Sequence, residues 1–318
     1  MSDNMNVIVI GAGYMGKEHS KVLLTLGITP TVVCRSQESA DKFEKEIGIR
    51  PLIGGVNNAL QKIKSFPTHA IVAVNVDQLA STTMLLANAG IKKMLVEKPV
   101  ALNMDELKEV VSVAEKTGTD IYVAYNRRFY ASTDKAIEII KADGGVSSFN
   151  FEFTEWGYKI EASKHPQPVK DGWLKANSSH VIDLAFFLGG EPEEISSYAA
   201  GTLPWHSSAS RYAGAGRTKA GALFSYQADW DAPGRWAVEI LTNNHRLYLR
   251  PLEKLSIQNK GSVNIETVEI DDSLDVKFKP GLHNQARAFL FGEKKERLAT
   301  IGAQVKHMSF FETIEQGK

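Results

Sequence analysis

The stretch VIVIGAGYMGKEHS, residues 7–20, decides the fold class of this chain. A short strand of four β-branched residues leads directly into Gly11, Gly13 and Gly16 at the beginning of a helical stretch. A GxGxxG pattern in this setting is typical of a dinucleotide site, because its glycines allow a tight turn, the approach of a pyrophosphate and close packing of the helix. The helix N-terminus then offers N–H groups and a partial positive charge to phosphate. A glycine turn without a ligand is the alternative.

The first 124 residues repeat a pattern of short apolar runs separated by helical stretches. The runs are VIVI (7–10), TVVC (31–34), AIVAV (70–74), MLVE (94–97) and IYVAY (121–125). Continuous apolar strands joined by helices indicate a parallel sheet that is covered on both faces. We therefore predict an α/β protein in which residues 1–124 form a doubly wound Rossmann domain for dinucleotide binding.

From residue 125 to residue 318 the strands alternate apolar and polar residues, as in SSFNFEFTEW and WAVEILTN. This alternation indicates a large open, mostly antiparallel sheet with one solvated face. We predict a second, α+β domain here for substrate binding and oligomerisation. Two stretches, 163–172 and 205–221, are predicted loops that could border a pocket. The helices that close the chain can pack back on the first domain.

The composition excludes several classes of protein. The chain has 318 residues, 37 Lys and Arg against 37 Asp and Glu, and a single cysteine, Cys34. The balanced charge argues against nucleic acid or an anionic membrane as a partner, and one cysteine permits no internal disulfide. No signal segment is evident, and His165, His206 and His283 lack a second ligand at metal-binding spacing. We expect a cytoplasmic protein that binds no metal.

The end of the second apolar run bears on which dinucleotide binds. NAD-specific sites carry an acidic residue there, which accepts hydrogen bonds from the adenosine ribose. This chain has Arg35 and Ser36 instead, so a 2′-phosphate would meet a guanidinium and a hydroxyl group. We predict NADP in preference to NAD. Alternatively, Arg35 is a solvated surface residue or stacks on the adenine.

Two basic residues are candidates for proton transfer. Lys98 lies in MLVEKPV, after a strand whose carboxyl end should face the cofactor crevice, and Pro99 restricts its backbone. His180 lies in LKANSSHVIDL, three positions before Asp183 and beside an apolar helix face. On these residues alone, Lys98 is equally compatible with a surface lysine, and packing is the simpler role for His180.

Four motifs give the chain a likeness to a known family over nearly its whole length. They are GAGYMG (11–16), EKP (97–99), YNRRF (125–129) and HVIDLAFFLGG (180–190). In this order and spacing the chain resembles the glucose-fructose oxidoreductase and inositol dehydrogenase family, Gfo/Idh/MocA. The resemblance implies a Rossmann domain joined to an open-sheet domain that holds the substrate and often forms the interface of a homodimer or homotetramer.

The resemblance also implies roles for individual residues. Lys98 would contact both substrate and cofactor, and His180 would transfer the proton between hydroxyl and carbonyl forms, so chemistry becomes the favoured role for His180. Asn126 and Arg127 would lie near the nicotinamide or the substrate. The remaining residues that we expect to bind the cofactor are Tyr14, Met15, Asn75 and Glu97. The family usually shows a histidine shortly after the fourth strand, and this chain offers Asn75, Asp77 and Gln78 there instead.

One position departs from the family pattern DxGxHxxD. The family carries a carboxylate four residues before the histidine, and this chain has Ala176 there. Without that anion, the charged form of His180 loses electrostatic support. Three outcomes are open: His180 and Lys98 carry out the proton transfer alone, another acid such as Asp171 or Glu155 substitutes, or the protein binds without turnover.

We therefore predict an NADP-dependent oxidoreductase that transfers a hydride between the nicotinamide and a secondary alcohol or ketone of a sugar, nucleotide sugar or cyclitol. Trp156 and Trp173 could stack on sugar rings, although packing is equally compatible with the sequence. The residues expected to bind the substrate are Lys98, Arg127, Trp156, Trp173, Asn177 and His180. The alternatives are a non-catalytic dinucleotide- or sugar-binding regulatory protein and a reductase of an imine or another non-carbohydrate carbonyl.

Overall fold

The computed structural model describes residues 5–63 and 65–317, and the chain divides into two compact units. The first unit comprises Met1–Ala124 and Val276–Lys306, and the second comprises Tyr125–Asp275 and His307–Lys318. The segment Val276–Lys306 thus returns to the N-terminal unit. That the second unit binds substrate and joins subunits stays a prediction.

The first unit is built on a seven-stranded sheet in the order β15-β6-β5-β4-β1-β2-β3. Its strands are β1 (Val7–Ile10), β2 (Thr31–Cys34), β3 (Leu52–Ile53), β4 (His69–Val72), β5 (Lys93–Val96), β6 (Asp120–Val123) and β15 (Ala299–Thr300). All neighbours are parallel except β15, which pairs antiparallel with β6. Every residue of β1 and β4 is buried, as a parallel sheet between two helical layers requires. The strand order is that of a Rossmann fold, so the predicted doubly wound domain is confirmed.

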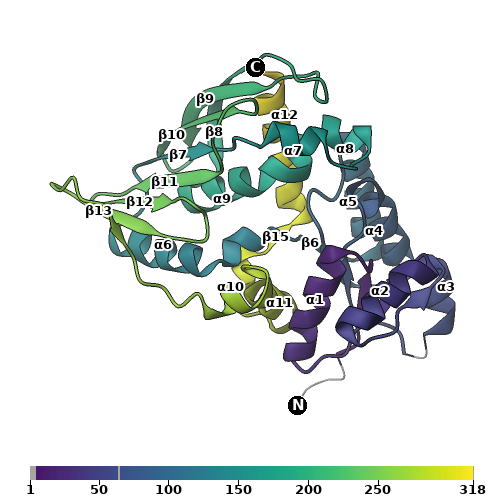
Figure 1. Cartoon of the computed structure of the whole chain (residues 1–318). Helices are drawn as coiled ribbons and strands as arrows, with labels where there is room; N and C mark the ends of the chain where they lie inside the picture. The colour runs from purple at the N-terminus through teal and green to yellow at the C-terminus, as the bar shows by residue number, and fades with distance from the viewer. Residues whose placement is uncertain (1–4, 64, 318) are drawn as a thin grey trace. The chain divides into compact units, whose positions relative to one another are not determined.

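Helices cover this sheet, and two of them end at a glycine. They are α1 (Tyr14–Thr25), α2 (Gln37–Ile47), α3 (Gly55–Lys62), η1 (Val76–Gln78), α4 (Leu79–Asn88), α5 (Met104–Thr117), α11 (Leu282–Phe291), η4 (Lys295–Arg297) and the start of α12 (Ile301–Gln316). Gly48 and Gly118 end α2 and α5 in the left-handed conformation that favours glycine. Helix α11 packs beside α1 through Val22, Leu282 and Ala286, which places this C-terminal helix on the N-terminal unit (Figure 1).

The second unit contains an eight-stranded sheet in the order β14-β13-β12-β11-β7-β10-β9-β8. Its strands are β7 (Ser148–Glu152), β8 (Pro192–Ala200), β9 (Arg211–Thr218), β10 (Leu223–Asp229), β11 (Ala237–Leu241), β12 (His245–Leu249), β13 (Ser256–Asn259) and β14 (Glu266–Thr267). Only β7 and β10 are parallel neighbours. The predicted mostly antiparallel sheet is therefore confirmed.

The core of the second unit lies between this sheet and helix α9. The helices of the unit are η2 (Asn126–Phe129), α6 (Ala131–Ala142), α7 (Gly157–Glu161), α8 (Gln167–Asp171), the π-helical turn η3 (Leu174–Ser178), α9 (Ser179–Gly189), α10 (Ser273–Lys277), which runs two residues beyond it, and the end of α12. The ring of Phe186 on α9 meets the rings of Phe149 and Phe151 edge-on at 5.5 and 5.4 Å. Gly189 lets the helix approach β7, because a Cβ there would come within 2.3 Å of the Phe149 ring.

Two predicted loops contain regular structure. Residues 205–221 include the eight-residue strand β9, and residues 163–172 include the short helix α8. Gly214 and Gly216 explain why β9 was missed, since glycine usually signals a turn. A Cβ at these positions would lie 2.3 Å from the Tyr226 hydroxyl and 2.0 Å from the backbone oxygen of Glu194, so both glycines admit close neighbours within the sheet. Strands β3 and β8 were also not predicted.

Candidate cofactor site and candidate active-site residues

The glycine-rich turn after β1 has the tight geometry that its sequence predicts. Gly11 adopts φ of 115°, and its N–H donates to the backbone oxygen of Val33 at 2.9 Å. A Cβ at Gly11 would come within 2.2 Å of the oxygen of Ala73, and one at Gly16 within 1.9 Å of the oxygen of Gly11. Side chains are thus sterically excluded at both positions, and the N-terminus of α1 is drawn against the sheet.

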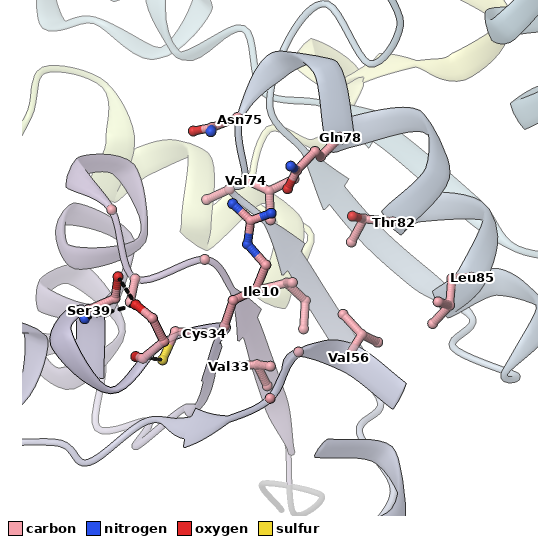
Figure 2. A pocket seen from close by; sticks show the side chains of 18 of the residues that line it. Ile10, Val33, Cys34, Ser39, Val56, Val74, Asn75, Gln78, Thr82 and Leu85 are labelled. Atoms are coloured by element: carbon pink, nitrogen blue, oxygen red, sulfur yellow. Dashed lines mark hydrogen bonds between the residues drawn. The ribbon is translucent and has the colours of Figure 1, made fainter. Parts of the chain in front are cut away.

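A cavity of about 820 Å³ opens at this turn, entirely within the first unit. Figure 2 shows Cys34 and Ser39 on its left side and Thr82 and Leu85 on its right side, with Asn75 and Gln78 above. We call it the glycine-loop cavity. It is lined by residues 10–13, 33–36, 39, 54–57, 73–75, 78, 81, 82 and 85. The carboxyl ends of β1, β2 and β4 therefore meet in one place, where open α/β sheets bind ligands.

Arg35 and Ser36 both line the glycine-loop cavity, and their side chains differ in the partners that they have within the protein. Ser36 begins helix α2: its hydroxyl accepts from the N–H of Ser39 at 3.3 Å and donates to the Ser39 hydroxyl at 3.0 Å. Arg35 is exposed, and among the described residues no carboxylate lies within ion-pair distance of it. A guanidinium and a helix N-terminus thus face the same cavity, which is a favourable place for an anion.

The residues at the start of α1 fit a bound dinucleotide. The first turn of α1 contains no acidic residue, and a Cβ at Gly13 would meet no atom of residues 5–63 or 65–317 within 4 Å, so ligand atoms can approach the backbone there. The side chains of Tyr14 and Met15 do not line the cavity: Tyr14 is exposed with the Lys279 ammonium 5.2 Å from its ring centre, and Met15 packs toward α11. Asn75, which we expect from the sequence to bind the cofactor, does line the cavity.

Several lining residues are not among those that the sequence assigns to cofactor binding. Gln78, Ser39, Asn57 and Thr82 all present polar side chains to the cavity. Gln78 and Asn75 belong to the single stretch AVNVDQLA after β4, so the rule that ligands bind at the carboxyl ends of strands could have found Gln78. Asn57 follows strand β3, which has two residues and is too short to be recognised from a sequence pattern.

Glu97 and Lys98 follow β5 and lie in different surroundings. Glu97 is not among the lining residues of the glycine-loop cavity; its Oε1 lies 3.1 Å from Nε2 of His19, a fully buried side chain on α1. Lys98 is half-buried in the turn that follows. Val100, two residues on, is fully buried with φ of 75°, a costly conformation for a β-branched residue. Such outliers persist where the surrounding structure enforces them, commonly at functional sites.

In the second unit, His180 is the second residue of α9 and is buried. Its ring lies 6.1 Å from that of Tyr125 and 6.2 Å from that of Trp236. Asp183, one turn later, accepts two hydrogen bonds from Arg128, at 2.8 and 2.6 Å. Of the two adjacent arginines in YNRRF, Arg128 is therefore neutralised by the motif that carries His180.

Arg127 and Asn126 lie close together. The Arg127 guanidinium donates to Oδ1 of Asn126 at 3.0 Å and stands 4.9 Å from the ring centre of Trp236. The buried Nε of Arg127 has no hydrogen-bond partner in the described structure. A cation with an unused donor is suited to a polar ligand group.

The two predicted substrate tryptophans have separate neighbours. Trp156 is 41% exposed, donates to the backbone oxygen of Gly234 at 3.1 Å and carries the Lys159 ammonium 4.0 Å from its ring centre. Trp173 packs edge-on to Trp205 at 6.3 Å. The exposed ring of Trp156 is thus the more accessible of the two for stacking.

The segment around the substituted Ala176 is a π-helical turn. Asn177 and Ser178 in this turn donate to Oε1 of Glu155 at 2.9 and 2.8 Å. Asp171, the other acid considered as a substitute, is exposed, and among the described residues it accepts only from Gln167, at 2.7 Å. Of the two acids, Glu155 is the one that contacts the turn.

Two further features of the described residues bear on function. No group of three or more His, Cys, Asp or Glu side chains in the described part of the chain is placed to hold a metal ion. Across residues 5–63 and 65–317, no helix combines the length and apolar character needed to cross a membrane.

Comparisons with known proteins agree with this geometry. Residues 5–125 match a family model described as an oxidoreductase family with an NAD-binding Rossmann fold. The chain is 23% identical over 205 residues to scyllo-inositol 2-dehydrogenase (NAD(+)) of Bacillus subtilis (strain 168), covering 62% of this chain and 58% of the relative. It is 25% identical over 201 residues to trans-1,2-dihydrobenzene-1,2-diol dehydrogenase of Macaca fuscata fuscata, covering 59% and 58%.

The chain spans less than two thirds of the length of these curated relatives. A solved structure of levoglucosan dehydrogenase in complex with NADH and levoglucosan is similar over 99% of this chain and 97% of the other, with a TM-score of 0.78 and 18% identity. At this identity the likeness is one of fold.

Proposed function

We propose that this chain is an NADP-dependent oxidoreductase of the Gfo/Idh/MocA family, because residues 5–125 match the model of an oxidoreductase family with an NAD-binding Rossmann fold. Its proposed reaction interconverts a secondary alcohol and a ketone of a sugar, nucleotide sugar or cyclitol. Proteins similar to it are named as dehydrogenases of scyllo-inositol, of a trans-1,2-diol and of levoglucosan, which supports this substrate class. The proposal includes a cytoplasmic homodimer or homotetramer.

The single observation that carries the cofactor assignment is the wall of the glycine-loop cavity at the end of β2. An NAD site would place a carboxylate there, and this chain places Arg35 and the N-terminus of α2 there. The guanidinium has no acidic partner among the described residues, so its charge is available to a 2′-phosphate. Ser36 supports the same anion by capping α2, which keeps the first N–H groups of the helix at the cavity.

Proton transfer is assigned to the two basic residues named from the sequence. The nicotinamide, when bound, supplies the hydride chemistry. Lys98, in the turn after β5, holds a positive charge that stabilises the alkoxide form of the substrate oxygen. His180 exchanges a proton with that oxygen as a general acid–base. Asn126, Arg127, Trp156, Trp173 and Asn177 are proposed to orient the substrate.

The test of the cofactor assignment is the affinity of the Arg35→Asp variant for the two nucleotides. We expect wild-type protein to bind NADPH more tightly than NADH in a fluorescence titration. Because a hydrogen bond to a charged group is worth about 1.5–3 kcal/mol, Arg35→Asp should reduce the NADPH-to-NADH affinity ratio by at least roughly tenfold. Lys45→Asp makes the same change of charge on the exposed far end of α2 and should leave the ratio unchanged. An unaltered ratio in Arg35→Asp would contradict the assignment.

A second candidate function is favoured by one observation, the alanine at position 176. The protein could keep the dinucleotide site and bind ligands without turnover, as a regulatory protein does. This function predicts tight NADPH binding with no oxidation by any ketone. Single-turnover measurements of NADPH oxidation by a panel of ketones distinguish it from the first.

A further inference from the structure

Glu155 is a buried carboxylate that follows strand β7 and is only 2% exposed. Its Oε1 accepts from Asn177, Ser178 and the indole N–H of Trp236, at 2.9, 2.8 and 3.3 Å. Its Oε2 accepts from Nη1 of Arg235 at 2.8 Å. We call these five residues the Glu155 cluster. Four donors converge on one side chain, which is close to the full acceptor capacity of a carboxylate.

The Glu155 cluster contacts His180 by two routes. The first is along the chain: Asn177 and Ser178 end the π-helical turn, and α9 with His180 begins at the next residue. The second is through space: the Trp236 indole that donates to Glu155 has its ring 6.2 Å from the ring of His180. A change at Glu155 therefore reaches the backbone before His180 and the aromatic ring beside it.

The turn that Glu155 contacts is a π-helical turn, and this geometry suggests a functional role for the contact. A π-helical turn is uncommon and is frequently found at functional sites. Here it spans Leu174–Ser178 and contains Ala176, the position at which the sequence lacks the expected carboxylate. Glu155 supplies a carboxylate to the same turn from another strand. Glu155 thus brings a carboxylate to the π-helical turn that lacks one at position 176, although Glu155 lies elsewhere in the sequence.

The charge of Glu155 depends on opposed effects. Burial raises the pKa of the Glu155 carboxyl above its ordinary value, and the Arg235 guanidinium and the hydrogen bonds from Ser178 and Asn177 offset only part of that rise. The Trp236 N–H and the Arg235 guanidinium can only donate, so they require an acceptor. The arrangement of donors favours the carboxylate form.

On these contacts we propose that Glu155 is a positioning residue for His180: it orders the π-helical turn, sets the orientation of the Trp236 and His180 rings, and supports the protonated imidazole. Its catalytic consequence rests on the proposed oxidoreductase function. Its effect on the titration of His180 does not, because that effect is electrostatic and is present without substrate.

Other charged groups surround His180, and they must be the same in all the proteins whose His180 titrations are compared. Asp183 lies one turn along α9 and is bonded to Arg128, with Nδ1 of His307 at 3.4 Å. The guanidinium groups of Arg127 and Arg235 stand 4.9 and 4.3 Å from the Trp236 ring centre. Lys175 in the π-helical turn is held by Glu315 at 2.8 Å and by Glu312 at 4.0 Å. None of these groups is altered by the variants below.

The experiment compares Glu155→Gln with Glu152→Gln. Glu152 is the matched control, because it is also a buried carboxylate of the β7 segment paired with an arginine. Among the described residues, its side chain bonds to Arg250 and not to the π-helical turn. Histidine titrations followed by NMR, with His180 assigned from a His180→Asn spectrum, should show the His180 midpoint at lower pH in Glu155→Gln, since loss of an anion disfavours the imidazolium. Glu152→Gln should leave that midpoint unchanged.

Turnover supplies the second readout. We expect kcat to fall about 10–100-fold in Glu155→Gln, the effect of a misplaced catalytic group, with NADPH affinity unchanged. The limb of the pH profile that belongs to His180 should move to lower pH in the same variant. If Glu155→Gln does not fold, Ser178→Ala removes one donor to Glu155 and should give the same directions of change with smaller size.

The two proposals fail in different ways. If wild-type protein shows no turnover but the His180 midpoint moves in Glu155→Gln only, the proposed function fails and the positioning role stands. If wild-type protein turns over and both glutamate variants match it in kcat and in the His180 midpoint, the positioning role of Glu155 is overturned and the proposed function is untouched. Equal effects in both variants would also overturn it, because they would reflect a general loss of stability.

Discussion

The glycine-loop cavity and the Glu155 cluster are built from the sequence in opposite ways. The cavity is formed by short contiguous segments at the ends of neighbouring parallel strands, and its shape depends on backbone positions such as Gly11 and Gly16. The Glu155 cluster is formed by side chains whose partners lie 22 to 81 positions away in the chain. The first region is local and the second is tertiary.

This difference determines what a substitution does in each region. Tight backbone geometry tolerates no added side chain, so the cavity should be sensitive to sterics and to the sign of charge at its rim. A buried carboxylate with four donors is sensitive to the loss of any partner, because the groups left behind remain desolvated. Changes in the first region should act on cofactor affinity, whereas changes in the second should act on the chemical step.

The largest expected effect is that of Lys98→Ala, which tests the first unit for chemistry beyond binding. Removal of the ammonium should reduce kcat by about 10⁴-fold, at the upper end for proton-transfer and charge-stabilising groups, and should leave NADPH affinity close to wild type. Steady-state kinetics and a fluorescence titration measure the two quantities. Lys93→Ala, an exposed lysine on the same strand, is the control. A near-normal rate for Lys98→Ala would remove this residue from the reaction.

The next effect is that of His180→Ala, the counterpart in the second unit. If His180 is a general acid–base, kcat should fall about 10²–10⁴-fold with little change in cofactor affinity. Thermal unfolding should be measured beside the rate, because His180 is buried against Tyr125 and Trp236. A lower melting temperature with a nearly normal rate would restore the packing role.

The smallest effect is expected outside both regions, at Asp143 after helix α6. Burial acts to raise the pKa of Asp143, but hydrogen bonds from Thr242, His245 and Asn244 outweigh it and hold the pKa below the usual range of aspartate. A lowered folded-state pKa means that this stabilisation is complete above the unfolded-state pKa and is lost as pH falls through the lower, folded-state value.

Asp143→Asn should therefore lower the melting temperature at pH 7, and the difference from wild type should shrink as the pH is lowered from about 4. Differential scanning calorimetry across this range measures it. Turnover at pH 7 should be unchanged, which separates stability of the second unit from its chemistry. A constant difference at all pH values would mean that the carboxylate charge is not what stabilises the turn between β11 and β12.

The same contrast explains how much could be predicted from the sequence. The Rossmann domain was predictable because its strands are continuous apolar runs and its glycines follow one of them, so a local pattern carries the whole fold. The open sheet was predictable in kind, but β9 was not, because Gly214 and Gly216 are typical of a loop. Only the structure shows that neighbouring residues fill the space where side chains at these two positions would lie. Glu155 was one of two acids that the sequence could offer. Only tertiary contacts distinguish it from Asp171, which is exposed.

The central claim is that the bound nucleotide is turned over, and one measurement tests it most directly. Protein loaded with a stoichiometric amount of NADPH is mixed with a panel of keto-sugars and ketocyclitols, and the near-ultraviolet absorbance of the reduced nicotinamide is followed for a single turnover. The account predicts that at least one ketone abolishes this absorbance in wild-type protein and that the Lys98→Ala variant retains it. Protein that binds NADPH tightly but loses no absorbance with any ketone, and none with a panel of imines, would contradict the account and identify a binding protein.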